Sequence, residues 1–142
     1  MDTSPLSLRP PAAARPLPLA LCPVRAGFPS PASDCMDASI DLQAYLVSDP
    51  PATFMVRVAG DSMRDAGILE DDLLVVDKGL PPVHGDIVVA TMDGEFTVKR
   101  LHGKNGRWML LAENPAYPAI VPAAGQELQI WGVVTACVRK FR

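Results

Sequence analysis

Residue types that build metal sites and disulfide frameworks are scarce in this sequence. Its 142 residues include three cysteines, at positions 22, 35 and 137, and two histidines, at positions 84 and 102. The cysteines are odd in number, widely spaced and without a CxxC pair, which is typical of a reducing compartment rather than of a disulfide scaffold. So few candidate ligands also disfavour a structural zinc site. We therefore expect no disulfide framework, no metal and no cofactor.

Basic charge and long apolar runs are also lacking. The sequence contains 13 Lys and Arg residues and 16 Asp and Glu residues, so its net charge is -3. This charge argues against a strongly basic nucleic-acid-binding module. The sequence contains no run of about 18 apolar residues, so we expect no transmembrane helix. The apolar stretch LPLALCPV is short and proline-interrupted, which disfavours a secretion signal. These absences predict a cytoplasmic protein without membrane contact and without direct sequence-specific binding of DNA.

Proline is abundant but unevenly distributed. Eight of the 15 prolines fall within the first 31 residues, with alanines filling much of the space between them. Such a stretch buries too little apolar surface to offset the entropy lost on ordering. We expect residues 1–31 to form a flexible Pro-rich N-terminal arm with polyproline-like pieces. Residues 32–142 are expected to form the folded domain.

A short helix is predicted just after the arm. Within residues 35–49, apolar side chains recur at nearly helical spacing. Asp37 or Ser39 could cap the first turn of such a helix, and the Pro50-Pro51 pair would stop it.

From Thr53 onward the apolar period shortens to that of β-strands. Phe54, Val56 and Val58 alternate with other residues, and a second strand is predicted from Leu73 to Val76. The stretch GDIVVATMDGEFTVKRLHG reads as two strands around an Asp-Gly pair, a strong hairpin signal. RWMLLAENP and LQIWGVVTACVRKF supply two further strands. Strands punctuated by Gly and Pro, with little helix, predict a compact, mostly β domain of about 90 residues.

A serine in the motif AGDSM is a candidate nucleophile. Ser62 follows a predicted strand, and Gly60 permits a sharp bend that could present its side chain at the strand end. Ser and Asp also favour turns for local hydrogen-bonding reasons, so Ser62 could simply cap a turn. A nucleophilic serine would need a neighbouring base.

Two kinds of base are available in the sequence. One is a histidine, either His84 with Asp86 beside it or His102 at a strand end. The other is Lys99, in the interior of the predicted strand EFTVKRLH, because Ser–Lys dyads follow the same logic as serine–histidine pairs. A lysine acts as a base only if burial lowers its pKa from about 10.4. Strand alternation does not settle whether Lys99 is buried or exposed, so both readings stay open.

The remaining charged groups look solvated. Lys78, Lys104 and Lys140 fall in predicted turns or near the end of the sequence. The carboxylate trio at positions 70–72 has no second cluster around it with metal-ligand spacing, so we expect a solvated loop there.

Three separated blocks stand in the order GFPSPASD, GDSM and GDIVVATMDGEFTVKRL. In this order they resemble the UmuD family of self-cleaving SOS-response proteins, which is related to LexA-type repressors and, in fold, to signal peptidases. The resemblance implies a LexA/signal-peptidase-like compact β domain. It further implies that Ser62 is the nucleophile, that Lys99 is the general base and that the bond between Ala26 and Gly27 is cleaved. Main-chain N–H groups at the Asp61-Ser62 turn would then stabilise the oxyanion.

The resemblance also implies partners. A RecA filament on single-stranded DNA would promote cleavage, and the shortened product would form a homodimer. This dimer would join a UmuC-like subunit, a Y-family polymerase, for translesion synthesis. The chain from Gly27 to Thr53 reaches up to roughly 85 Å when extended, so cleavage in cis and in trans both stay open. Only about 26 residues precede the bond, which favours the polymerase-accessory branch over a LexA-like repressor with an N-terminal DNA-binding domain. A catalytically silent interaction module and a signal-peptidase-like enzyme acting on other proteins are the remaining alternatives.

Overall fold

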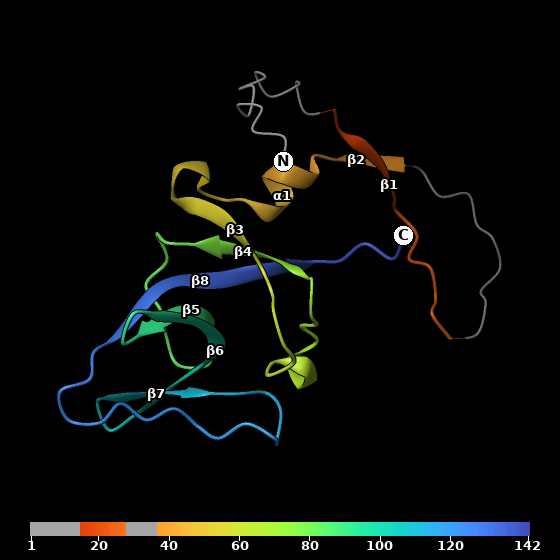
Figure 1. Ribbon diagram of the computed structural model, residues 1–142. Coiled ribbons are helices and arrows are strands. Elements are labelled where there is room, and N and C mark those ends of the chain that lie inside the picture. The colour runs from red at the N-terminus through yellow and green to blue at the C-terminus, as the bar shows by residue number, and fades with distance from the viewer. Residues whose placement is uncertain (1–14, 28–36) are drawn as a thin grey trace, which may run out of the picture. The chain divides into compact units, whose positions relative to one another are not determined.

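The N-terminal part of the chain contains a small two-stranded sheet. The computed structural model describes residues 15–27 and 37–142, and the chain divides into two compact units, 1–45 and 46–142. In the first unit, β1 (Leu17–Ala20) pairs antiparallel with β2 (Asp37–Ile40) (Figure 1). The expectation of a polyproline-like conformation is therefore wrong for Leu17–Ala20. Pro18 lies opposite Ser39, which is compatible with a sheet made only of edge strands, where one side of each strand needs no N–H donor. Of the other residues of the expected arm, 15–16 and 21–27 belong to neither a helix nor a strand, and 1–14 and 28–31 lie outside the described residues.

The short helix begins later than the sequence indicates. α1 (Leu42–Leu46) has five residues, and the Ala44 N–H donates to Asp41 Oδ1 at 3.1 Å. Asp41 therefore caps the helix, and the expected caps Asp37 and Ser39 belong to β2 instead. The competing interaction is the pairing of β2 with β1, which holds these two residues extended. Positions 35 and 36 of the expected helix lie outside the described residues.

The second unit is built on a six-stranded antiparallel sheet, which confirms the mostly β fold. The strand order is β3-β4-β8-β5-β6-β7, and Figure 1 shows it from β3 in yellow to β7 in cyan. Two 3₁₀ turns, η1 before β3 and η2 after it, complete the regular structure of this unit. The bounds are η1 (Pro50–Ala52), β3 (Thr53–Arg57), η2 (Arg64–Ala66), β4 (Leu73–Asp77), β5 (Ile87–Met92), β6 (Glu95–Lys104), β7 (Arg107–Leu111) and β8 (Leu128–Val138).

The hairpin between β5 and β6 forms where the sequence predicts it. Asp93 and Gly94 join the two strands, and their φ angles are 51° and 81°. Both values lie in the left-handed region that a type I′ turn requires, which is why Asp-Gly is a favoured pair there. The tight turn fixes the register of β6, with Lys99 directly opposite Val88.

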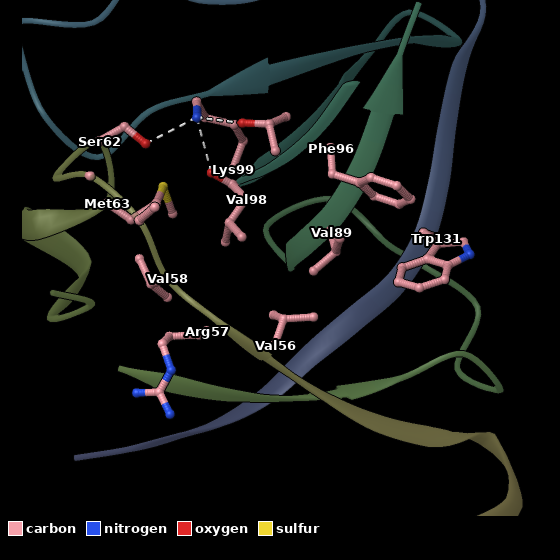
Figure 2. Close-up of a pocket in the computed structure, with 13 residues that line it drawn as sticks. Val56, Arg57, Val58, Ser62, Met63, Val89, Phe96, Val98, Lys99 and Trp131 are labelled. Carbon is pink, nitrogen blue, oxygen red and sulfur yellow. Dashed lines mark hydrogen bonds between the residues drawn. The ribbon is translucent and has the colours of Figure 1, made fainter. Parts of the chain in front are cut away.

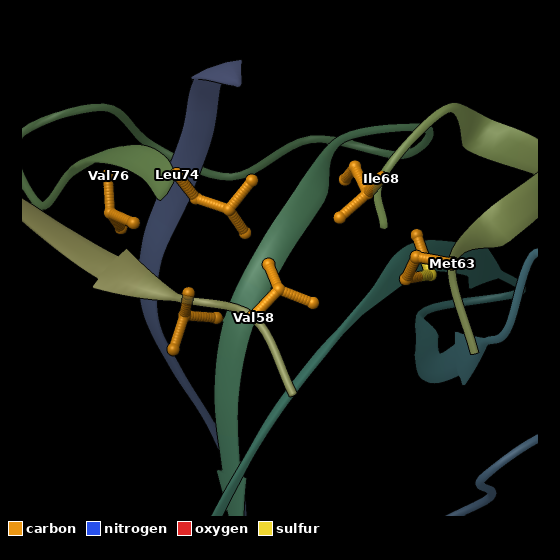
Figure 3. Close-up of a cluster of buried hydrophobic side chains, with 6 residues drawn as sticks. Val58, Met63, Ile68, Leu74 and Val76 are labelled. Carbon is orange, nitrogen blue, oxygen red and sulfur yellow. The ribbon is translucent and has the colours of Figure 1, made fainter. Parts of the chain in front are cut away.

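The sheet carries a hydrophobic cluster on each face. Val88 and Val89 are neighbours in β5 but belong to different clusters, because successive side chains of a strand point to opposite faces. One cluster, shown in Figure 3, gathers side chains from β4, β5 and the segment between β3 and β4: Val58, Met63, Ile68, Leu74, Val76 and Val89. The other consists of Val88, Ala90, Leu101, Leu110 and Val133.

Strand β8 contains two irregularities that bend it across the sheet. In its pairing with β5, Val89 lies opposite Gly132 and Ala90 opposite Ile130, so Trp131 is an extra residue without a partner in β5. A second register shift lies in its pairing with β4. Bulges of this kind re-aim side chains, and this one gives Trp131 its place beside Phe54, with ring centroids 4.4 Å apart.

Two expectations about polar residues are wrong. Asp72 is not solvated: it is 1% exposed and accepts two hydrogen bonds from the Arg139 guanidinium, each 2.6 Å long. Arg139 lies far along the sequence, so the local pattern of three carboxylates could not reveal its pairing. Cys22 is disulfide-bonded, whereas Cys137 has a free thiol, because cysteine number and spacing do not determine which thiols meet in space. Cys35 lies outside the described residues.

Within residues 15–27 and 37–142, no helix is long and apolar enough to cross a membrane.

Candidate active site

Ser62 is presented by a loop whose two ends are anchored in the domain. β3 ends at Arg57, and Gly60 has a φ of 87°, a left-handed conformation that glycine adopts without steric penalty. The residue after the serine, Met63, is buried in the hydrophobic cluster with 3% of its surface exposed. Because the chain bends at Gly60 and is anchored again at Met63, Ser62 has little freedom to move.

Lys99 lies in the interior of β6 and is buried. Thr97, Lys99 and Leu101 share one face of the strand, because side chains alternate along it. Leu101 is fully buried, and Lys99 is 8% exposed. Burial lowers the pKa of Lys99 below its ordinary value, because desolvation disfavours the charged ammonium. The open question of which side of the strand Lys99 occupies is thus decided in favour of burial.

The structure brings Ser62 and Lys99 into direct contact, although 37 positions separate them in the sequence. The Lys99 Nζ atom lies 3.0 Å from Ser62 Oγ, 2.7 Å from Thr97 Oγ1 and 3.1 Å from the Val98 carbonyl oxygen (Figure 2). A neutral amine has two N–H donors and one lone pair. Its donors can serve Thr97 Oγ1 and the Val98 carbonyl, which leaves the lone pair to accept the Ser62 hydroxyl proton. The three contacts therefore fit a neutral lysine acting as a base on Ser62.

Thr97 is a site residue whose contact with the lysine amine the sequence reasoning missed. Strand alternation places it on the same face as Lys99 two residues later, so the signal was present. A side-chain bond between the two depends on rotamers that alternation does not fix.

A pocket of about 390 Å³ extends from the Ser62–Lys99 pair along β3 and β6. The pair lies at one end, and Phe96 and Trp131 lie at the other, with ring centroids 4.9 Å apart (Figure 2). An open, mostly apolar groove beside a serine and a buried lysine is suited to an extended peptide. The lining residues are Val56, Arg57, Val58, Ala59, Gly60, Ser62, Met63, Val89, Phe96, Thr97, Val98, Lys99 and Trp131.

The two histidines meet each other rather than the serine. The rings of His84 and His102 stack edge to face with centroids 4.7 Å apart, and His84 Nδ1 accepts a hydrogen bond from the Gly103 N–H. The carboxylate of Asp86 accepts a hydrogen bond from the Val83 N–H. Of the two candidate kinds of base, the one that contacts the Ser62 hydroxyl is therefore the lysine, Lys99.

The Ala26-Gly27 bond lies in the unit 1–45. Both residues are exposed and belong to neither a helix nor a strand. Exposed segments without regular secondary structure are the ones most readily cleaved by proteases.

Comparisons with known proteins agree with this site. Residues 18–135 match the model of the Peptidase S24-like family. The chain is 55% identical to Protein SamA of Salmonella typhimurium over 121 residues, which cover 85% of this chain and 82% of SamA. It is 42% identical to Protein MucA of Escherichia coli over 120 residues, or 84% of this chain and 82% of MucA. It is 41% identical to the LexA repressor of Bordetella pertussis over 116 residues, or 82% of this chain and 53% of the repressor. The resemblance to the UmuD family and its LexA-type relatives is thereby confirmed.

Proposed function

Because this chain belongs to the Peptidase S24-like family of serine peptidases, we propose that it cleaves its own backbone between Ala26 and Gly27 with a Ser62–Lys99 dyad. The observation that carries this proposal is the 3.0 Å contact between Lys99 Nζ and Ser62 Oγ. It is supported by the lowered pKa of the buried amine.

The proposed reaction proceeds through an acyl-enzyme. The neutral amine of Lys99 takes the proton of the Ser62 hydroxyl, and Oγ attacks the carbonyl carbon of Ala26. The bond to the Gly27 nitrogen breaks, and the Lys99 ammonium returns its proton to the departing amine. Water, deprotonated by the same amine, then hydrolyses the ester and frees Ser62.

An oxyanion hole at the start of the Ser62 loop would stabilise the tetrahedral intermediate. Neither the Asp61 nor the Ser62 N–H donates a hydrogen bond to any residue of the described ranges. Two main-chain donors left free beside a nucleophile are the usual form of such a site, and one donor contributes about 3 kcal/mol to transition-state stabilisation.

The cellular role that we propose follows from the resemblance to the UmuD family. Cleavage is promoted by a RecA filament on single-stranded DNA, and the product dimer acts as an accessory subunit of a Y-family, UmuC-like translesion polymerase. Its support is the identity of 42–55% to SamA and MucA over most of the chain.

A LexA-like repressor is the second candidate, favoured by the 41% identity to the LexA repressor. Binding to an operator-type duplex with a sequence preference would support the repressor. Binding of the cleaved dimer to a polymerase subunit, without sequence-dependent DNA binding, would support the accessory role.

The proposed cleavage is tested by incubating the purified chain at alkaline pH and sequencing the N-terminus of any product. We expect a product that begins at Gly27, and we expect none from Ser62→Ala or Lys99→Ala. Lys104→Ala, which removes an exposed lysine of the same strand, is the matched control and should cleave like the parent. Absence of the fragment from the parent, also with a RecA filament present, would instead support a catalytically silent interaction module.

A further inference from the structure

We propose that the segment 113–117 is a brace that holds the Ser62 loop at bonding distance from Lys99, with Asn114 and Tyr117 as positioning residues. The inference rests on the proposed dyad but concerns residues outside the pocket. It follows from the contacts of this segment with the Ser62 loop and with Arg100, the residue next to Lys99.

The backbone of Glu113 is bonded to the serine loop on both sides. Its N–H donates to the Ser62 carbonyl oxygen at 2.9 Å, and its carbonyl oxygen accepts from the Asp65 N–H at 2.8 Å. Glu113 thereby holds the loop at two points, Ser62 and Asp65. Ser62 cannot shift along its own chain direction without breaking one of these bonds.

The side chain of Asn114 fixes the residue before the serine. Asn114 is 6% exposed, and its Nδ2 donates to the Asp61 carbonyl oxygen at 2.9 Å. Its Oδ1 accepts from the Ala116 N–H at 3.0 Å, which orients the amide group. A buried amide that lost either bond would leave a polar group unpaired, so the geometry is strongly specified.

Tyr117 fixes the side chain of the same residue. Its hydroxyl donates to Asp61 Oδ1 at 2.6 Å, a charge-assisted bond of the stronger kind. The Tyr117 N–H in turn donates to the Asn114 carbonyl oxygen at 3.1 Å. Asp61 is therefore held through both its backbone and its side chain by two residues of one segment.

The same segment is tied to the strand that carries the base. The Glu113 carboxylate forms an ion pair with Arg100, the residue after Lys99 in β6. A second nitrogen of Arg100 donates to the Gly85 carbonyl oxygen at 2.7 Å. The segment thus connects the nucleophile loop on one side to β6 on the other, and so sets the distance between Ser62 and Lys99.

Catalysis is sensitive to that distance. A displacement of about 1 Å can slow an enzymatic step by roughly 100-fold. We therefore expect Asn114→Ala to slow self-cleavage by roughly 100-fold. Tyr117→Phe removes one bond from an exposed position and should slow it by about tenfold. Tyr45→Phe, at an exposed tyrosine in α1, is the matched control and should cleave at the parent rate.

The brace is tested independently of cleavage by the titration of a thiol placed at position 62. In the Ser62→Cys variant, the rate of alkylation by iodoacetamide is followed against pH and quantified on the peptide that contains position 62. A thiol held beside Lys99 should titrate below the ordinary value of about 8.5. Adding Tyr117→Phe or Asn114→Ala should move this midpoint back toward 8.5, because the amine is no longer held against the sulfur.

The outcomes separate the brace from the proposed function. If the parent does not cleave but the midpoint shifts as described, the peptidase proposal fails and the brace stands. If Tyr117→Phe and a folded Asn114→Ala cleave at the parent rate, the brace is refuted. It is also refuted if they cleave slowly while the midpoint at position 62 stays unchanged, because these residues would then act elsewhere. Should Asn114→Ala fail to fold, Tyr117→Phe decides alone.

Discussion

The pH dependence of self-cleavage should be set by the buried amine of Lys99. Desolvation lowers its pKa below the ordinary lysine value of about 10.4. Only the neutral amine can accept the Ser62 proton, so the rate should rise tenfold per pH unit below that pKa. Above it the rate should level off, because all of the amine is then neutral.

Replacing Thr97 by the nearly isosteric valine should move this profile in a defined direction. Thr97 Oγ1 lies 2.7 Å from Nζ and can accept a hydrogen bond from either form of the lysine. Such a bond is worth about 1.5–3 kcal/mol to an ammonium and about 0.5–1.5 kcal/mol to a neutral amine. Its loss therefore disfavours the charged form by about 1 kcal/mol or more, and the midpoint should fall by roughly 1 pH unit. The plateau rate should fall as well, because the amine is oriented by one bond fewer.

The assay is the first-order rate of fragment formation between pH 6 and 11, with circular dichroism to verify that the fold persists. Thr91→Val, the same change in the neighbouring strand β5, serves as the control and should leave the midpoint in place. A parent profile that is flat, or whose midpoint lies at or above 10.4, would refute the neutral-lysine mechanism. A midpoint that stays or rises in Thr97→Val would refute the role given to the threonine hydroxyl.

Two further predictions concern stability. Asp72→Asn should lower the free energy of unfolding by about 1.5–3 kcal/mol near neutral pH, because it removes the charge from the pair with Arg139. The hydrogen bonds from Arg139 and from other groups hold the pKa of Asp72 well below its usual range. The stabilisation by the Asp72 charge is therefore fully present above about pH 4 and disappears as the pH falls further. Urea titrations of parent and variant should therefore converge in acid, and a constant gap would contradict the assignment. Gly132→Ala should lower the free energy of unfolding by about 1–3 kcal/mol, because the added Cβ would lie 2.5 Å from Val76 Cγ1. An unchanged urea midpoint would contradict this prediction and show that β8 relaxes freely there.

The strands of the large sheet could be predicted because their signal is local. Alternating apolar residues in β3 and the Asp93-Gly94 turn between β5 and β6 report directly on backbone conformation. The order of the strands could not be read this way. β8 lies between β4 and β5, and its bulge at Trp131 depends on packing between strands far apart in the sequence.

The first unit was predicted less well for the same reason. Its proline content favours an irregular chain, yet Leu17–Ala20 pairs with Asp37–Ile40 across 16 intervening residues. That pairing also displaced the start of the helix to Leu42. Local propensity was overruled in both cases by a partner that no window of sequence contains.

The candidate dyad could be named from the sequence, but its surroundings could not. Ser62 and Lys99 stand in recognisable motifs, whereas the burial of Lys99 required the fold. Asn114 and Tyr117 carry no local signal at all, because their role depends on the loop at residues 59–66 folding back against them.

The central claim is tested most directly by the intact mass of the chain after exposure to a RecA filament on single-stranded DNA with nucleotide. After reduction of the disulfide at Cys22, the parent should yield two species, residues 1–26 and residues 27–142, and Ser62→Ala and Lys99→Ala should each remain whole. A parent that stays intact under these conditions and at alkaline pH, or a Ser62→Ala variant that gives the same two masses, would contradict self-cleavage by this dyad.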